Sequence, residues 1–166
     1  MKKIIRLQKK VNKILIDISA KEIWDDEEIN LVKEILLFCY DFLSIKKSTE
    51  LSVRLTDDKE IMELNKKYRN DNSPTNVLSF CLKKNDTNKQ DIEAIGDIVI
   101  SKDTILKELK DNEKTFKQHI SHIAIHGLLH LLGYVHDNDK EAKIMENIEI
   151  KILNKLNIPN PYVGVI

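Results

Sequence analysis

The sequence predicts an α+β domain in which a small mixed β-sheet packs against several α-helices. Strand-like runs gather in the first two-thirds of the chain and helical patterns cover the rest, which favours this class. The 166 residues suit one compact domain with a real hydrophobic core. No repeat and no long low-complexity linker divides the chain, so we expect a single domain over residues 1–166.

Four segments have the composition or the alternation of β-strands. Lys13 to Ile18 is apolar and rich in β-branched residues, and Leu51, Val53 and Leu55 alternate with polar residues at the strand period. The other two strand-like segments are Val77 to Leu82 and Gly96 to Ser101. We expect the polar stretch from Lys83 to Glu93 to be a linker or a long hairpin loop.

Five segments predict helices. Asp25 and Asp26 precede the first, where a carboxylate can accept a hydrogen bond from the free N–H groups of the first turn. A polar loop from Arg69 to Thr75 follows the second helix, and residues 157–166, with two prolines and a glycine, are expected to form an irregular tail. The expected helices are about Glu27 to Leu43, Asp57 or Asp58 to Tyr68, Lys102 to Lys110, Thr115 to Leu132 and Asp139 to Leu156.

Composition indicates a folded, water-soluble chain but names no partner. Hydrophobic residues make up 42% and charged residues 33%, and Lys+Arg and Asp+Glu both number 27. No apolar run approaches the length of a membrane span, and the N-terminus lacks the pattern of a secretory signal. The N-terminal segment carries a cluster of basic residues: Lys2, Lys3, Arg6, Lys9, Lys10 and Lys13. The cluster could bind nucleic acid, but we favour a solvated basic terminus.

Two cysteines, Cys39 and Cys81, lie far apart and match no metal-binding or redox spacing. Each falls in an apolar run, so we interpret both as reduced core residues. Reduced cysteines are typical of proteins in the cytoplasm, which is where we expect this one.

The segment from His126 to His136 (HGLLHLLGYVH) carries the strongest chemical signal. Two histidines four apart on a helix lie on the same face, one turn from each other. Gly133 suits the left-handed position that ends a helix, so the chain can reverse and return His136 to the same point. Three imidazoles around one zinc ion leave a fourth position for water, which is the catalytic arrangement.

All five histidines fall between His119 and His136, which argues against chance surface or core histidines. At about 100° per residue, His119 and His122 share the face of His126 and His130. We interpret these two as structural, or as hydrogen-bonding support for the ligands. A nucleic-acid contact and a fourth metal ligand are the alternatives.

The residue after the first histidine bears on the reaction class. Metalloproteases with the spacing H-x-x-x-H-x-x-G-x-x-H place a glutamate there as the general base. This chain has Gly127, which cannot accept a proton from water, so peptide hydrolysis by that route is disfavoured. Met145 lies in a predicted helix, so it supplies no methionine turn of the protease kind.

At these residues the sequence resembles the bacterial YbeY family of metal-dependent, single-strand-specific endoribonucleases of ribosomal RNA maturation. His126 to His136 follow the family pattern H-G-x-L-H-L-x-G-Y-D-H except at Val135. Further matches are Leu64-Asn65-x-x-Tyr68-Arg69, Thr75 to Phe80, Gly96 to Ile100, and the helix with Met145, Glu146 and Glu149. The resemblance covers about Leu51 to Tyr162.

The resemblance implies zinc at His126, His130 and His136 and a functional Arg69 in a positively charged cleft. A guanidinium suits phosphate, because it binds two oxygens at once and stabilises added negative charge. Ser79, Asn76 and Asp97 are more typical of caps and turns than of catalysts. Three positions depart from the family pattern: Val135 and Asn76, where aspartate is usual, and Cys81, where proline is usual. Val135 cannot ligate a metal or orient an imidazole, so we expect either looser metal binding or substitution by Asp137.

Our hypothesis is a cytoplasmic zinc-dependent endoribonuclease acting on single-stranded RNA, in maturation of the 16S ribosomal RNA 3′ end and in ribosome quality control. His126 and Arg69 are the expected catalytic residues, and contacts with the ribosomal small subunit or an assembly factor are implied. Two alternatives stay open: a peptidase or other metallohydrolase, with a carboxylate such as Asp97 or Asp137 near the metal, and a non-catalytic ribosome-associated module whose metal has a fourth protein ligand, such as His122.

Overall fold

The computed structural model describes residues 14–82 and 92–163. The basic cluster between Lys2 and Lys13 lies outside the described residues, as does most of the expected linker after Lys83. The expected domain boundaries, 1–166, therefore stay a prediction. Every helix within the described ranges is too short or too polar to span a bilayer.

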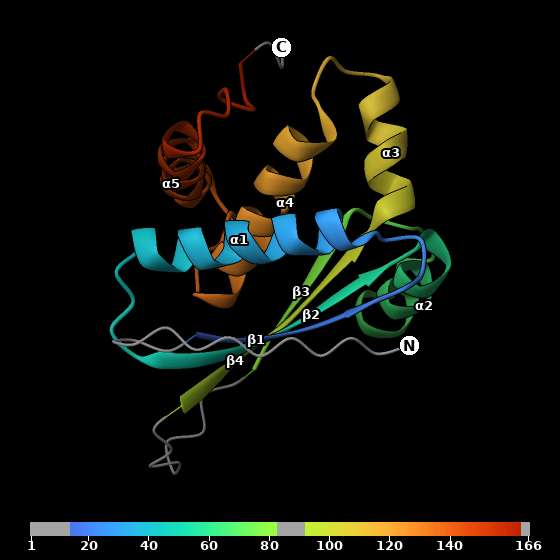
Figure 1. Ribbon diagram of the computed structural model, residues 1–166, viewed down its shortest axis with the longest axis horizontal. Helices are drawn as coiled ribbons and strands as arrows, with labels where there is room; N and C mark the ends of the chain where they lie inside the picture. Colours follow the sequence, from blue (N-terminus) through green and yellow to red (C-terminus); the bar gives the residue numbers. More distant parts are fainter. Residues whose placement is uncertain (1–13, 83–91, 164–166) are drawn as a thin grey trace.

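Four strands form one mixed sheet, and helices cover both of its faces (Figure 1). The strand order is β1-β2-β4-β3; β1 and β4 each run parallel to β2, and β3 runs antiparallel to β4. The predicted α+β class with a small mixed sheet is confirmed. The strands are β1 (Ile14–Ala20), β2 (Ser48–Thr56), β3 (Val77–Cys81) and β4 (Ile92–Ser101). The helices are α1 (Asp26–Phe42), α2 (Asp58–Arg69), α3 (Lys102–Lys110), α4 (Phe116–Leu131) and α5 (Asp139–Lys155).

Capping side chains mark the starts of α1, α2, α4 and α5. The Asp25 carboxylate accepts a hydrogen bond from the Glu28 backbone N–H, and the Asp57 carboxylate does the same for Glu60. Thr115 caps α4 in a reciprocal capping box with Gln118. These bonds satisfy N–H groups that have no partner inside the helix, so the starts lie within a residue of those predicted.

Alternation along the strands separates two cores. The larger one, between the sheet and helices α1, α4 and α5, buries alternate strand residues such as Ile98 and Ile100. The smaller one, under α2, buries Ile61 against Leu78 and Val99. Since successive side chains of a strand point to opposite faces, β3 presents Ser79 and its alternate neighbours to α4. That face of β3 becomes one wall of the candidate site.

Two predictions about the sheet were wrong. β4 begins at Ile92, four residues before Gly96, because a bulge at Ile95 lets the strand continue: Glu50 pairs with Ala94 and the next residue of β2 pairs with Gly96. Cys81, expected in the core, is exposed. It ends an edge strand, so its apolar run has a neighbouring strand on one side only.

Gly96 and Gly133 both have positive φ, at +141° and +95°, but their surroundings differ. A Cβ on Gly96 would lie 2.1 Å from the Phe80 carbonyl oxygen, whereas a Cβ on Gly133 meets nothing within 4 Å. We expect Gly133→Ala to cost roughly 1 kcal/mol of unfolding free energy through backbone strain alone. Gly96→Ala adds a clash with backbone and should cost roughly 3 kcal/mol.

Urea unfolding of the metal-free variants measures this difference. Equal losses for the two variants would contradict the clash with the Phe80 carbonyl that is expected at Gly96.

Candidate metal centre

A pocket of about 590 Å³ lies between α4, β3 and the end of α2. His126 and His130 from α4 and His136 from the following turn line it, together with Arg69 and Tyr162. Segments far apart in the sequence therefore meet at one hollow.

Gly127 sets how closely α4 approaches the sheet. A Cβ at this position would lie 3.2 to 3.3 Å from side-chain atoms of Val77, Ser79 and Ile98. The Ser79 hydroxyl also donates a hydrogen bond to the Gly127 carbonyl, at 3.0 Å. The residue after His126 thus faces the sheet and not the pocket, so a glutamate here would meet packed strands. This geometry adds a second reason to set aside the metalloprotease mechanism.

Gly133 ends α4 in the manner predicted. The Gly133 N–H donates to the His130 carbonyl and the Tyr134 N–H donates to the Leu129 carbonyl, both at 3.0 Å. The second of these bonds spans five residues, and with the positive φ of Gly133 it forms the helix-ending motif that reverses the chain. The reversal returns His136 toward the two histidines of α4.

The structure brings the three predicted histidines together. The ligand nitrogens of His126, His130 and His136 all lie within 4.8 Å of one another. The Nε2 atoms of His126 and His130 are 3.0 Å apart, and the His136 ring centroid is 4.9 Å from that of His130 and 5.6 Å from that of His126. Such a spacing lets three side chains share one ion.

Hydrogen bonds behind the rings indicate which nitrogens face the pocket. His130 Nδ1 lies 3.0 Å from the Tyr134 carbonyl oxygen, which can only accept, so Nδ1 carries the proton. His126 Nδ1 lies 2.6 Å from the Glu149 carboxylate and is likewise the donor. Both Nε2 atoms then present lone pairs to each other. Two acceptors at 3.0 Å repel unless a cation lies between them, so the donor set fits a metal ion.

Glu149 is a feature of the centre that sequence reasoning missed. Its side chain is 0% exposed, and it accepts a hydrogen bond from the Tyr162 hydroxyl as well as from His126. Burial alone would raise the pKa of this carboxyl, but the hydrogen bonds with His122, His126 and Tyr162 outweigh it and lower the pKa to about 2. One signal was available in the sequence: Glu149 interrupts the apolar stripe of α5 four residues after Met145.

His119 and His122 have partners of their own outside the three-histidine group. His119 Nε2 lies 2.5 Å from Glu108, whose carboxylate also accepts hydrogen bonds from Asn76. His122 Nε2 lies 3.3 Å from Glu149 and 3.1 Å from the Tyr162 hydroxyl. These contacts support the structural interpretation of both. His122 does form a second possible ligand group, with His126 and Glu149.

The protonation of His130 suits metal binding. Its burial, reinforced by the neighbouring imidazoles of His126 and His136, lowers its pKa below the usual 6.5. A neutral imidazole is the form that ligates a metal, so the pocket keeps His130 ready for an ion at neutral pH.

Arg69 was predicted to be the first residue of the loop, but it is the last residue of α2. Its guanidinium lines the same pocket as the histidines, and Nη2 donates a 3.3 Å hydrogen bond to the Ser79 carbonyl. The bond reaches across to β3, so it holds the guanidinium at the pocket wall.

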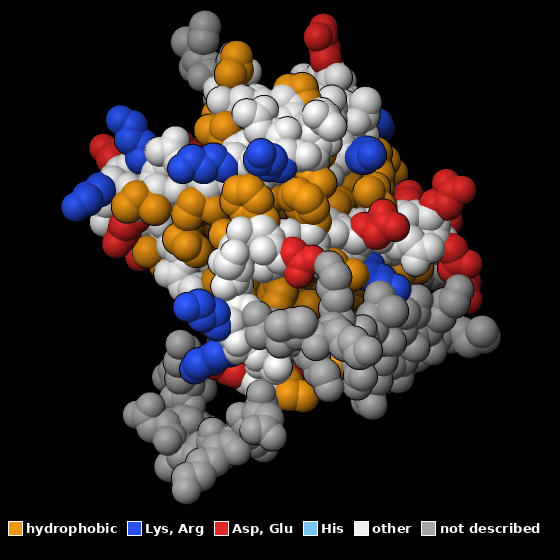
Figure 2. All heavy atoms as spheres, turned by 60° about the vertical axis from the view of Figure 1, so that its left-hand side comes forward, with side chains coloured by type: hydrophobic (Ala, Val, Ile, Leu, Met, Phe, Trp, Pro, Cys, Tyr) orange, Lys and Arg blue, Asp and Glu red, His pale blue; other side chains and the backbone are white. Residues whose placement is uncertain are grey.

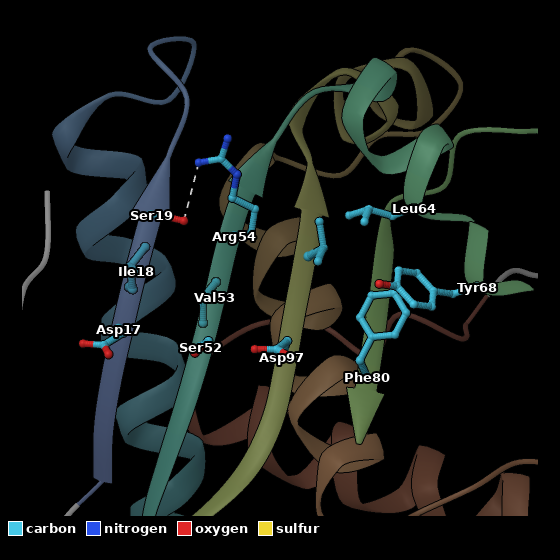
Figure 3. A pocket seen from close by; sticks show the side chains of 11 residues that line it. Asp17, Ile18, Ser19, Ser52, Val53, Arg54, Leu64, Tyr68, Phe80 and Asp97 are labelled. Atoms are coloured by element: carbon cyan, nitrogen blue, oxygen red, sulfur yellow. Dashed lines mark hydrogen bonds between the residues drawn. The ribbon is translucent and has the colours of Figure 1, made fainter. Parts of the chain in front are cut away.

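The two carboxylates considered for a peptidase, Asp97 and Asp137, lie in different pockets. Asp97 lines a separate groove on the other face of the sheet, opposite α4, beside Tyr68 and Phe80 (Figure 3). Asp137 lines the histidine pocket and is exposed, and Val135, at 40% exposure, lines it too. Of the two candidate bases, Asp97 is therefore separated from the histidines by the sheet.

Comparison with known proteins identifies the family. The family model described as Endoribonuclease YbeY matches residues 13–157. Proteins named endoribonuclease YbeY from Francisella tularensis subsp. tularensis (strain WY96-3418) and subsp. novicida (strain U112) are each 40% identical over 144 residues, covering 84% of this chain and 89% of the relative. The solution structure of TM1509 from Thermotoga maritima, 21% identical, shares the fold with a TM-score of 0.57 over 86% of this chain and 92% of that one. The resemblance seen in the motifs is thereby confirmed: the chain belongs to the endoribonuclease YbeY family.

Proposed function

We propose that the protein is a cytoplasmic, zinc-dependent endoribonuclease that cuts single-stranded RNA during ribosomal RNA maturation, at the 16S 3′ end, and in ribosome quality control. Family membership supports the reaction class. The observation that carries the metal part is the convergence of three imidazoles beside an arginine in one pocket.

His126, His130 and His136 are the proposed ligands. The hydrogen bonds of His126 and His130 leave nitrogen lone pairs facing the pocket. Neutral imidazole suits zinc, although nickel and copper bind similar donor sets. When bound, a zinc ion supplies Lewis acidity and lowers the pKa of water. His126 is also the proposed catalytic histidine, since it joins the ligand set to the buried Glu149.

Arg69 is the proposed phosphate-binding residue. A guanidinium has five N–H donors, and the bond to the Ser79 carbonyl uses one of them. The others can bind phosphate oxygens in a planar, bidentate manner and stabilise the charge that develops as the phosphodiester bond breaks.

Ribosomal contacts are proposed to supply part of the affinity for RNA. The chain has equal numbers of acidic and basic residues, and both kinds project on the face shown in Figure 2. Counterion release from phosphates needs clustered positive charge, so a balanced chain gains from docking on a ribosomal small-subunit protein or an assembly factor. The substrate would then be presented and not captured from solution.

Cleavage of a labelled single-stranded ribosomal RNA fragment tests the residue roles. We expect His126→Ala to lose both metal and activity, because it removes a ligand. Arg69→Ala should keep its metal but cleave roughly 100-fold more slowly or worse, because it removes a donor that stabilises transition-state charge.

Lys66→Ala, an exposed cation one turn earlier on α2, is the matched control and should cleave like wild type. A fully metallated wild type that does not cut, or an Arg69→Ala variant that cuts normally, would sink the assignment.

Metal affinity is expected to depend on pH with a definite sign. Protons compete with the ion for imidazole nitrogens, so apparent affinity should be level above about pH 7.5 and fall below about pH 6.5. Because the pKa of His130 is lowered, its own competition with protons sets in at more acidic pH than that of an ordinary histidine. Competition with a chromophoric chelator between pH 5.5 and 8 measures this dependence, and a flat profile would argue against histidine ligands.

A further inference from the structure

We propose that Glu149 is a positioning residue that holds the His126 ring with Nε2 toward the metal ion. The inference deepens the proposed function and rests on the metal site proposed there. The proposal rests on the contacts that Glu149 of α5 makes with His122 and His126 of α4 and with Tyr162 of the C-terminal segment.

The two carboxylate oxygens of Glu149 have different partners. Oε1 lies 2.6 Å from His126 Nδ1, whereas Oε2 accepts from the Tyr162 hydroxyl and lies 3.3 Å from His122 Nε2. One oxygen therefore orients the ligand, and the other is itself held from the C-terminal segment. A carboxylate braced in this way has little freedom to follow a rotating imidazole.

Stability alone does not explain a carboxylate at this position. The other buried residues of α5 are Met145, Ile152 and Leu153, and Glu149 is fully buried among them. Burying a charge costs free energy unless polar partners compensate, and the ion pairs described for Glu149 are both with histidines. An apolar residue would suit the stripe better, which indicates that the carboxylate serves the histidines.

His126 belongs to two possible ligand groups, and Glu149 decides between them. One group contains His130 and His136, and the other contains His122 and Glu149. As long as His126 Nδ1 donates to Glu149, only Nε2 has a free lone pair, and that nitrogen faces His130. Without the carboxylate, the ring can flip and the proton can occupy either nitrogen, so fewer molecules present the ligating atom.

Glu149→Gln tests the proposal, because it keeps the size of the side chain and removes its charge. We expect zinc affinity, measured by competition with a chromophoric chelator, to fall roughly 10- to 100-fold. Glu146→Gln makes the same change one turn earlier on α5 and should leave the affinity unchanged. Urea unfolding of both variants checks that the fold is intact.

Nitrogen-15 NMR of the histidine rings reports the tautomer of His126, which would not change if Glu149 only stabilised the fold. Above pH 7.5, metal-free wild type should show His126 protonated at Nδ1, and Glu149→Gln should show a mixture of the two tautomers. Tyr162→Phe removes one brace from Oε2 without touching His126, so it should lower zinc affinity by a smaller factor. It also tests the same hydrogen-bond chain if Glu149→Gln fails to fold.

The proposal is overturned if a folded Glu149→Gln variant keeps wild-type zinc affinity and an unchanged His126 tautomer. If Glu149→Gln does not fold, an unchanged zinc affinity in Tyr162→Phe overturns it. RNA cleavage separates this from the proposed function. If wild type binds zinc but cuts no RNA, the function fails while the positioning role stands. If wild type cuts and Glu149→Gln keeps its metal and tautomer, the positioning role fails alone.

Discussion

The close seating of α4 on β3 and β4 is the constraint on which the rest of the site depends. Gly127 permits it, since any side chain there would press on Val77, Ser79 and Ile98. With α4 packed in this way, His126 and His130 line the pocket together with Arg69, whose guanidinium reaches the Ser79 carbonyl on β3. One small residue thus links core packing to the placement of the three histidines proposed as metal ligands.

The centre is assembled in layers that come from different parts of the chain. One helix and the turn after it supply the three imidazoles, α5 supplies the buried carboxylate behind them, and the end of α2 supplies the arginine. A ligand held only by its own side-chain torsions would sample several orientations. Hydrogen bonds to Glu149 and to the Tyr134 carbonyl restrict His126 and His130 before an ion arrives, which lowers the cost of ordering them on binding.

Local patterns in the sequence predicted the α+β class, the helix caps and the convergence of the three histidines, because each depends on residues a few positions apart. The bulge at Ile95, the exposure of Cys81 and the proposed role of Glu149 depend on what packs against them from distant segments. Glu149 was visible as part of a family motif, but its partner His126 lies 23 residues away in another helix. Only the family resemblance indicated a functional role for Arg69, because its sequence context alone is that of an ordinary surface cation.

X-ray absorption spectroscopy of the zinc-loaded protein tests the proposed three-histidine site, because it counts and identifies the ligands of the ion. The proposed metal site predicts three imidazole ligands in wild type and two in His136→Ala, with no sulfur from Cys81, which lines the same pocket. A fourth protein ligand, whether a further imidazole or a carboxylate, would contradict it, and would favour a structural metal in a ribosome-associated module over a catalytic centre.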